Sequence, residues 1–278
     1  MRPGERRQVH EDSGMTVGKV VANIPFRRRV WAFAHRFASP PHFYRLANTL
    51  LPWFSWGFAL TVLPGLYLGL VQAPADYQQG DSYRIIFIHV PSAWMSLFIY
   101  MTMAIAGGIG LIWHMKLADV VAASCAPIGA SFTFLALVTG SLWGKPMWGA
   151  YWVWDARLTS EPILLFLYLG YMALQSAFDD RRVAAKASAV LALVGVINIP
   201  IIHYSVIWWN TLHQGATVSR MDTPAIHWTM LVPLLLMAVA FNFYFAMVLM
   251  IRARNEVLLR ERNSVWVREL MNEKVGSE

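Results

Sequence analysis

The sequence predicts an all-α polytopic membrane protein with six transmembrane helices, both termini in the cytoplasm and short interfacial helices in the outer loops. Three observations support this fold class. Of the 278 residues, 57% are hydrophobic and only 14% are charged, whereas a soluble domain carries about a quarter charged residues. Six windows are apolar enough to span a bilayer, and the basic residues collect on one side of them.

Each predicted span follows from the need for about 20 mostly apolar residues to cross the hydrocarbon core. The windows lie near Leu51–Val71, Val90–Trp113, Val121–Trp143, Pro162–Phe178, Ala187–Tyr204 and Trp228–Ile251. Residues 1–45 form an Arg-rich cytoplasmic extension, which is either a solvated tail or a membrane-surface helix. Residues 46–252 form the membrane domain, and residues 253–278 form a cytoplasmic tail.

The distribution of basic residues orients the six spans. Of the 23 Lys and Arg residues, only Arg84, Lys145, Arg157 and Arg220 fall in the loops 72–89, 144–161 and 205–227. Basic residues favour the cytoplasmic side, so these three loops are predicted to be the outer ones. The net charge of +7 then indicates contact with anionic membrane lipid and not with nucleic acid.

Two absences from the sequence restrict its chemistry. Cys125 is the only cysteine, so neither an internal disulfide nor a Cys-x-x-Cys-His haem attachment site can form. No Walker motif occurs, so ATP hydrolysis by a P-loop would have to come from a partner. We expect a transport or delivery component and not an enzyme.

The second outer loop concentrates aromatic residues between two apolar windows. Trp148, Tyr151, Trp152 and Asp155 have the spacing i, i+3, i+4 and i+7, so they would share one face if the segment were helical. Such a shelf suits a flat aromatic ligand at the membrane boundary, although an ordinary interfacial aromatic belt is an alternative. The candidate ligand-binding residues are Trp143, Trp148, Gly149, Tyr151, Trp152, Trp154 and Asp155.

Four of the eight histidines lie on the outer side, and imidazole is a good axial ligand for haem iron. His89 and His203 each lie at the end of a predicted span, at the depth of the aromatic shelf. They form the preferred ligand pair, with His213 and His227 as weaker candidates. Arg84 and Arg157 could bind the two haem propionates as bidentate donors. Lipid phosphate or a simple Asp155–Arg157 pair would explain the same charges.

The run Trp148-Gly-Ala-Tyr-Trp-Val-Trp-Asp155 resembles the tryptophan-rich W-G-x-x-W-x-W-D signature of the haem-handling protein superfamily. Several flanking segments narrow the resemblance to the haem exporter protein C (CcmC) family of bacterial cytochrome c maturation, over roughly residues 40 to 265. These segments are Ala-Pro-Ala-Asp-Tyr-Gln-Gln-Gly at 73–80, His89-Val-Pro, the run 136–148 and Asn198-Ile-Pro-Ile-Ile-His203.

The resemblance implies a multi-pass protein of the bacterial inner membrane that holds haem b at its periplasmic face. Carried onto this chain, the axial ligands would be His89 and His203, with the tryptophan-rich loop between them. The implied partners are a periplasmic haem chaperone, to which haem becomes covalently attached, and an ABC-type complex. That complex would contain an ATPase subunit, a second membrane subunit and a small single-span subunit.

Three rival functions make different demands on the spans. A b-type haem electron-transfer subunit usually places paired histidines inside the bilayer, and no histidine lies in the middle of a predicted span. A small-molecule permease predicts ionisable residues near the midplane. A purely structural subunit needs no histidines. The electron-transfer subunit is the principal alternative.

Overall fold

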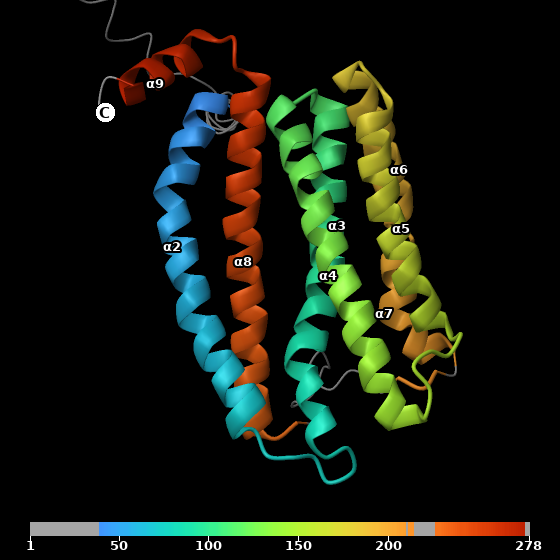
Figure 1. Ribbon diagram of the computed structural model, residues 1–278. Coiled ribbons are helices and arrows are strands. Elements are labelled where there is room, and N and C mark those ends of the chain that lie inside the picture. The colour runs from blue at the N-terminus through green and yellow to red at the C-terminus, as the bar shows by residue number, and fades with distance from the viewer. Residues whose placement is uncertain (1–38, 210, 214–225, 276–278) are drawn as a thin grey trace, which may run out of the picture.

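The fold is an elongated bundle of helices, and the computed structural model describes residues 39–209, 211–213 and 226–275. Residues 1–38 of the predicted N-terminal extension lie outside the described residues. Within the described ranges all regular elements are helical, and Figure 1 shows the long helices running side by side. They are α2 (Pro40–Tyr67), η2 (Leu68–Gln72), η3 (Asp81–Ile85), α3 (Ile86–Trp113), α4 (Lys116–Trp148), α5 (Ala156–Ala177), α6 (Arg181–Gly195), α7 (Asn198–Trp208), α8 (Trp228–Arg260) and α9 (Val265–Val275).

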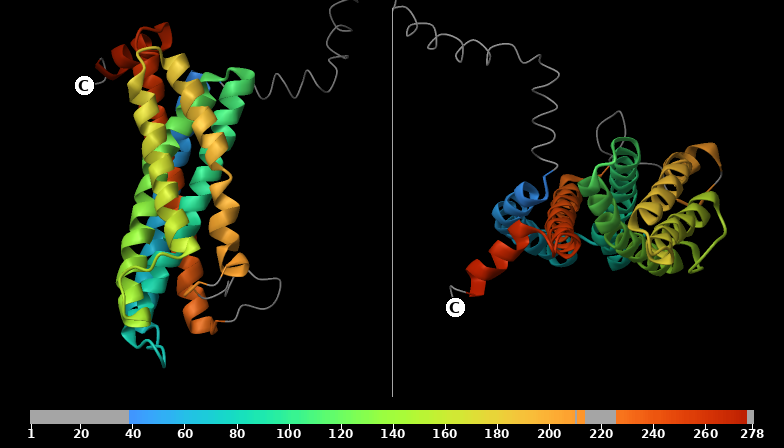
Figure 2. Two further views of the ribbon diagram at one scale, coloured as in Figure 1. Left: turned by 90° about the vertical axis from the view of Figure 1, so that its right-hand side faces the viewer. Right: turned by 90° about the horizontal axis from the view of Figure 1, so that it is seen from above.

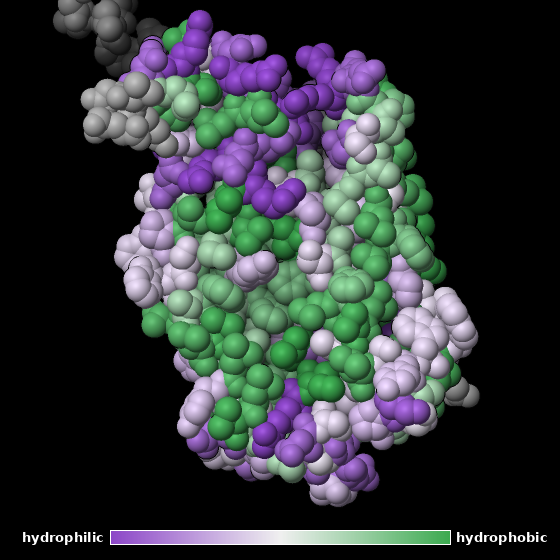
Figure 3. Space-filling model, in the orientation of Figure 1, coloured by the Kyte–Doolittle hydropathy of each residue, from purple (hydrophilic) through white to green (hydrophobic). Residues whose placement is uncertain are grey.

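The helices pack as neighbouring pairs. Helix α2 packs along α8, α3 along α4, and α5 along α6, and Figure 2 shows these pairs from above. Helices α3 and α4 occupy the middle and contact both flanking pairs. The hydrophobic side surface between the two ends of the bundle is visible in Figure 3.

Five helical segments are long and apolar enough to cross a membrane: Pro40–Gln72, Asp81–Trp113, Lys116–Trp148, Arg181–Trp208 and Trp228–Arg260. The chain is therefore a polytopic membrane protein, as predicted. These segments include five of the six predicted windows and extend beyond them. The remaining window, Pro162–Phe178, lies almost entirely within α5, which packs against α4, α6 and α7. The sixth crossing stays a prediction.

The span that contains α6 and α7 is broken near its middle. Residues Val196 and Ile197 form a turn between the two helices, four and three residues before Pro200. Proline lacks the N–H that would bond to the carbonyl four residues earlier, and its ring clashes with that carbonyl. The break therefore follows from Pro200. Just after it, Asn198 Nδ2 donates to the Ser160 carbonyl on α5 at 2.9 Å, which ties the two helices together.

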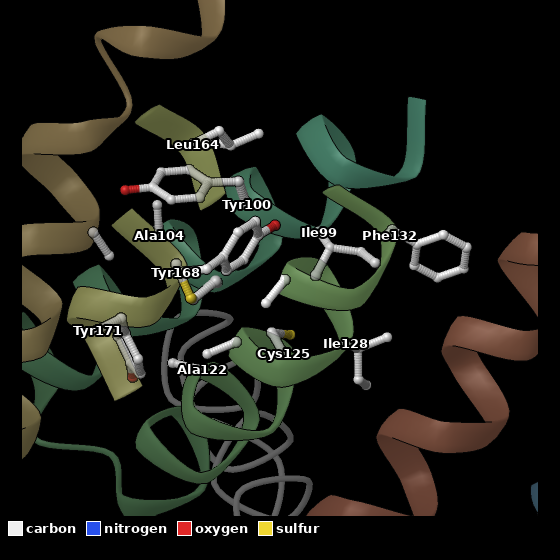
Figure 4. Packing of buried hydrophobic residues seen from close by; sticks show 14 of the residues in the cluster. Ile99, Tyr100, Ala104, Ala122, Cys125, Ile128, Phe132, Leu164, Tyr168 and Tyr171 are labelled. Atoms are coloured by element: carbon white, nitrogen blue, oxygen red, sulfur yellow. The ribbon is translucent and has the colours of Figure 1, made fainter. Parts of the chain in front are cut away.

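Close helix contacts in the core depend on glycine. Figure 4 shows Tyr168 of α5 and Tyr100 of α3 beside Cys125 of α4 in this core. The Tyr168 hydroxyl donates to the Ser96 carbonyl at 2.8 Å, and a Cβ placed on Gly129 would overlap the Tyr168 phenol. Only glycine lets α4 approach the tyrosine this closely.

Helix α9 crosses the end of the bundle beside α2 and α8 (Figure 1). Its Trp266 ring packs on Tyr44 with 5.9 Å between ring centroids, and Trp266 Nε1 donates to Glu261 at 2.8 Å. Arg260 and Arg181 both pair with Glu256, at 2.6 and 3.6 Å. This end lies opposite the first two predicted outer loops and the described ends of the third, which are at the other end of the bundle (Figure 1).

Candidate haem-binding site

The tryptophan-rich segment is not a continuous helix. Helix α4 ends at Trp148, Gly149 adopts a left-handed conformation with φ of 76°, and residues 150–155 contain no helix before α5 begins at Ala156. The predicted shared helical face of Trp148, Tyr151, Trp152 and Asp155 is therefore wrong. The cause is Gly149, which adopts positive φ without steric cost and caps α4.

His89 lies in the first turn of α3 and is held from one side. Its Nδ1 is 3.0 Å from the Ala136 carbonyl oxygen and 3.1 Å from Thr139 Oγ1, both on α4. A carbonyl can only accept, so Nδ1 carries the proton and donates it. In the neutral ring the lone pair then sits on Nε2. A Cβ at Gly140 would lie 2.8 Å from His89 Cε1, so the ring fills the space that glycine leaves.

Trp143 connects His89 to the first outer loop. Its ring packs edge-on against His89, with 5.7 Å between centroids, and against Tyr83 at 6.0 Å. Trp143 Nε1 donates to Gln79 Oε1 at 2.8 Å. This indole therefore supports the histidine and has its single N–H donor already engaged.

His213 lies at the same end of α4, next to Trp148. The two rings meet edge-on with 5.0 Å between centroids, and His213 Nδ1 is 3.6 Å from Asp155 Oδ2. His213 also interacts electrostatically with His89 and with Arg157. Because Trp143 and Trp148 belong to one helix end, His89 and His213 both lie beside the end of α4.

The environment of His213 keeps its ring uncharged. Burial, reinforced by the positive charge of Arg157 and opposed by Asp155, lowers the pKa of His213 to about 4. An imidazole with this pKa is neutral at pH 7 and has a lone pair available for a metal ion. The sequence placed His213 only in a loop, and neither its burial nor its indole neighbour could be read from spacing.

His203 has a different setting. It lies in α7 with an exposed side chain, and its ring packs edge-on against Tyr204 with 4.7 Å between centroids. Its predicted role as the second ligand is not tested by this geometry. His227 caps the first turn of α8, where its Nδ1 lies 2.8 Å from Thr229 Oγ1.

The aromatic side chains of the 149–155 segment are largely open to the surroundings. Tyr151 is 57% exposed and Trp154 is 80% exposed, while Trp152 packs edge-on against Trp154 at 5.6 Å. The Trp152 Nε1 atom is buried without a hydrogen-bond partner. A pocket of about 440 Å³ adjoins this segment and is lined by Val153, Trp154, Asp155, Ala156, Trp209, Thr211 and Leu212.

The two arginines of the predicted site have different partners. The Arg84 guanidinium donates to the carbonyls of Leu70 and Ala73, at 2.7 and 3.0 Å, and pairs with Asp81 at 3.3 Å. Arg84 therefore ties the first outer loop to the end of the first predicted span. Arg157 lies in the first turn of α5. It interacts electrostatically with Asp155 and Glu161, and also with His89 and His213 beside the end of α4.

The sequence prediction missed a half-buried carboxyl group near this site. Glu161 was assigned to an outer loop, but it lies in α5 and its Oε1 accepts a hydrogen bond from Ser96 Oγ at 2.9 Å. Ser96 is ten residues into α3. The helical period of α5 places Glu161 on the face that meets α3. The prediction missed this position because the predicted span began at Pro162, one residue later.

The fold and this cluster define a polytopic membrane protein with paired imidazoles and indoles at one end of its bundle. A family model described as Heme exporter protein C matches residues 33–268. Proteins named heme exporter protein C are 52% identical in Escherichia coli K12 and 48% identical in Haemophilus influenzae. Each alignment covers 87% of this chain and 98% of the relative.

A more distant relative comes from a plant. The putative cytochrome c biosynthesis ccmC-like mitochondrial protein of Marchantia polymorpha is 45% identical, over 77% of this chain and 90% of its own length. With the family match and the bacterial relatives, the assignment is clear: the chain belongs to the heme exporter protein C (CcmC) family.

Proposed function

We propose that this chain holds haem at the outer end of the bundle, with the iron between His89 and a second outer histidine, His203 or His213, and presents it to a periplasmic haem chaperone. The observation that carries the proposal is the setting of His89, whose Nδ1–H donates to the Ala136 carbonyl and whose ring packs against Trp143 at the indole-rich end of α4. Membership of a family named for heme export supplies the ligand class.

The chemistry of the two imidazoles fits haem iron. The porphyrin occupies four coordination positions and leaves two axial ones, which a pair of neutral histidines can fill. His89 presents Nε2 because its Nδ1–H donates to Ala136. The side chain of His203 is exposed on α7, so its ring is open to a ligand, whereas burial lowers the pKa of His213 to about 4 and keeps that ring neutral at pH 7. A neutral imidazole has the lone pair that ligation needs.

The surrounding side chains suit the rest of the haem molecule. Trp148, Trp152 and Trp154 offer flat apolar faces for the ring, and the buried Trp152 Nε1 still lacks an acceptor. Arg157 provides the positive charge for a propionate, whereas Arg84 is engaged by the backbone. An open loop on one side leaves an edge of the ring accessible to a partner, so the site serves positioning more than group catalysis.

The same proposal includes the machinery around the chain. Loading of the chaperone would proceed beside an ABC-type complex with an ATPase subunit, a second membrane subunit and a small single-span subunit. The absence of a Walker motif from this sequence agrees with ATP hydrolysis by a partner. A b-type electron-transfer subunit is the second candidate, but His89 lies in the first turn of α3 and His203 lies five residues before the end of the segment Arg181–Trp208, so neither is at the middle of a span.

The proposal is tested by titrating haem into the purified protein and recording its absorption spectrum. We expect the spectrum of low-spin iron with two imidazole ligands, and we expect His89→Ala to convert it to a high-spin form with weaker retention. Cells that carry His89→Ala should lose holo-cytochrome c. The proposal would be contradicted if the wild-type protein took up no more haem than detergent micelles without protein.

We further propose six crossings with both termini in the cytoplasm. Helix α5 has 22 residues, which corresponds to about 33 Å of helix and matches the roughly 30 Å of hydrocarbon core. The proposed outer loops hold only four of the 23 basic residues, and α9 lies at the other end of the bundle.

Cysteine labelling in intact cells tests this orientation. Tyr77→Cys, at a side chain 91% exposed, should react with a membrane-impermeant maleimide. Met271→Cys, on α9, should react only after lysis. The native Cys125 is buried and gives little background. Labelling of Met271→Cys in intact cells would reverse the orientation.

A further inference from the structure

The first outer loop contains a tight turn that is held by its own backbone. Asp76 and Gly80 exchange two backbone hydrogen bonds, at 3.2 and 2.9 Å. The Asp76 carboxylate also accepts from the backbone N–H groups of Gln78 and Gln79, each at 2.9 Å. Gly80 has a φ of 56°, a conformation that glycine adopts without steric cost. The turn 76–80 therefore has one defined shape.

Two contacts at Gln79 fix the turn 76–80 to the rest of the protein. Trp143 Nε1 on α4 donates to Gln79 Oε1 at 2.8 Å, and Ser82 Oγ donates to the Gln79 carbonyl at 2.6 Å. The Trp143 ring in turn packs against His89, with 5.7 Å between ring centroids. Gln79 is therefore linked through a single indole to the histidine that we propose as an axial ligand.

The apex of the turn is presented to the outside. Tyr77 is 91% exposed, and Gln78 beside it is also exposed. Figure 1 and Figure 2 show the loop before α3 projecting beyond the outer ends of the long helices. A bilayer covers the apolar sides of those helices, so the apex lies on the aqueous side of them, within reach of a soluble protein.

We propose that the turn 76–80 is the docking surface for the soluble protein that receives haem, with Tyr77 as its anchoring side chain. The inference rests on the proposed function. Tyrosine buries a large, rigid ring at low conformational-entropy cost and adds one hydroxyl, so it is common among the residues that dominate protein interfaces. A turn whose shape is already fixed loses little further entropy when a partner binds.

The charges near the apex favour a protein over membrane lipid as the occupant. Asp76 and Asp81 are acidic, and Arg84 is engaged by Asp81 at 3.3 Å and by two backbone carbonyls. Attraction to anionic headgroups comes from basic side chains. The expected partner surface therefore has an apolar pocket for the phenol ring, a hydrogen-bonding group for its hydroxyl and a basic or neutral rim.

Docking at this turn has a defined consequence for haem transfer. The contact between Gln79 and Trp143 fixes the position of a docked partner relative to His89, and so relative to the iron. Covalent attachment needs the acceptor side chain of the partner to be held against the edge of the haem ring, and holding two reactants in one geometry lowers the barrier substantially. Tyr77 acts by positioning the partner and does not itself contact haem.

Tyr77→Ala separates docking from haem binding. Because Tyr77 lies outside the haem site, this variant should bind haem as wild type does. It should bind the partner about 10- to 100-fold more weakly, as expected when an anchoring side chain is truncated. Tyr77→Phe retains the ring and should lose much less affinity. Trp228→Ala is the matched control, because Trp228 is a 67% exposed aromatic residue at the outer end of another element, α8.

The probe is the purified, haem-free periplasmic chaperone, titrated onto the full-length protein in detergent with haem bound. The readouts are chaperone affinity, haem uptake by each variant and the amount of haem covalently attached to the chaperone in cells. In addition, an excess of chaperone should protect Tyr77→Cys from a maleimide, whereas Met271→Cys on α9 should stay reactive.

The outcomes separate this inference from the proposed function. Weaker chaperone binding and loading in Tyr77→Ala, with haem uptake unchanged, supports the docking surface. Wild-type chaperone affinity in Tyr77→Ala overturns the inference and leaves the proposed function intact. Loss of haem uptake in Tyr77→Ala also overturns it, because the turn would then act on the haem site itself. If the wild-type protein takes up no haem, the proposed function fails, and this inference fails with it.

Discussion

One of the two variants His203→Ala and His213→Ala should lose bound haem and cytochrome c assembly, whereas His227→Ala should leave both close to wild type. The reason is the setting of each ring. His203 is exposed on α7, where its ring is open to a ligand, and His213 interacts with His89. His227, in contrast, caps α8 and its Nδ1 is engaged by Thr229. Loss of an axial ligand should weaken haem binding by at least about 100-fold, the upper end of what loss of a supporting contact costs.

The spectrum decides between the two histidines more sharply than affinity does. Loss of the second ligand should change the low-spin bis-imidazole spectrum to a five-coordinate high-spin one, and added imidazole should restore the low-spin form. His227→Ala is the matched control, because His227 is also an outer histidine but caps α8. Loss of haem in His203→Ala, with retention in His213→Ala, would establish the pair His89 and His203, and the converse result would establish the pair His89 and His213. A wild-type spectrum in both variants would contradict the prediction.

Hydropathy and charge predicted most of the scaffold because a bilayer imposes simple rules on both. Five of the six predicted windows correspond to segments that meet the length and hydropathy needed to cross a membrane. The window edges were too short, since amphipathic turns such as Lys116–Val120 and Gly144–Trp148 continue α4 beyond its apolar part. An apolar stretch marks the part of a helix that lies in lipid, whereas the helix itself continues to its capping residues.

The candidate site was harder to predict because it depends on contacts across loops. The spacing of Trp148, Tyr151 and Trp152 matched a helix, but Gly149 ends α4 and sends the following residues in another direction. His89 was predicted correctly as a residue at the start of a helix. The neighbours of His213 are the indole of Trp148 and the carboxylate of Asp155, and no local pattern links residue 213 to residues 148 and 155.

The tight packing behind His89 leads to a prediction at a residue that never touches haem. Gly140→Ala should weaken haem binding about 10- to 100-fold, the range expected when a group supporting a ligand is disturbed. The new Cβ would lie 2.8 Å from His89 Cε1 and 3.4 Å from Nδ1. The ring must move, and it then loses its hydrogen bonds to Ala136 and Thr139 on the same helix.

The bundle itself should tolerate this change, because alanine within a helix is favoured over glycine by roughly 0.5–1 kcal/mol. Gly108→Ala is the matched control, since a Cβ there meets Leu193 at an ordinary 3.5 Å. Haem titration and thermal melting of both variants separate the site from the fold. Gly140→Ala with wild-type haem affinity would mean that His89 need not occupy this position to act as a ligand. Weaker haem binding with unchanged melting would show that the absence of a side chain at Gly140 of α4 sets the position of His89, and so of the iron.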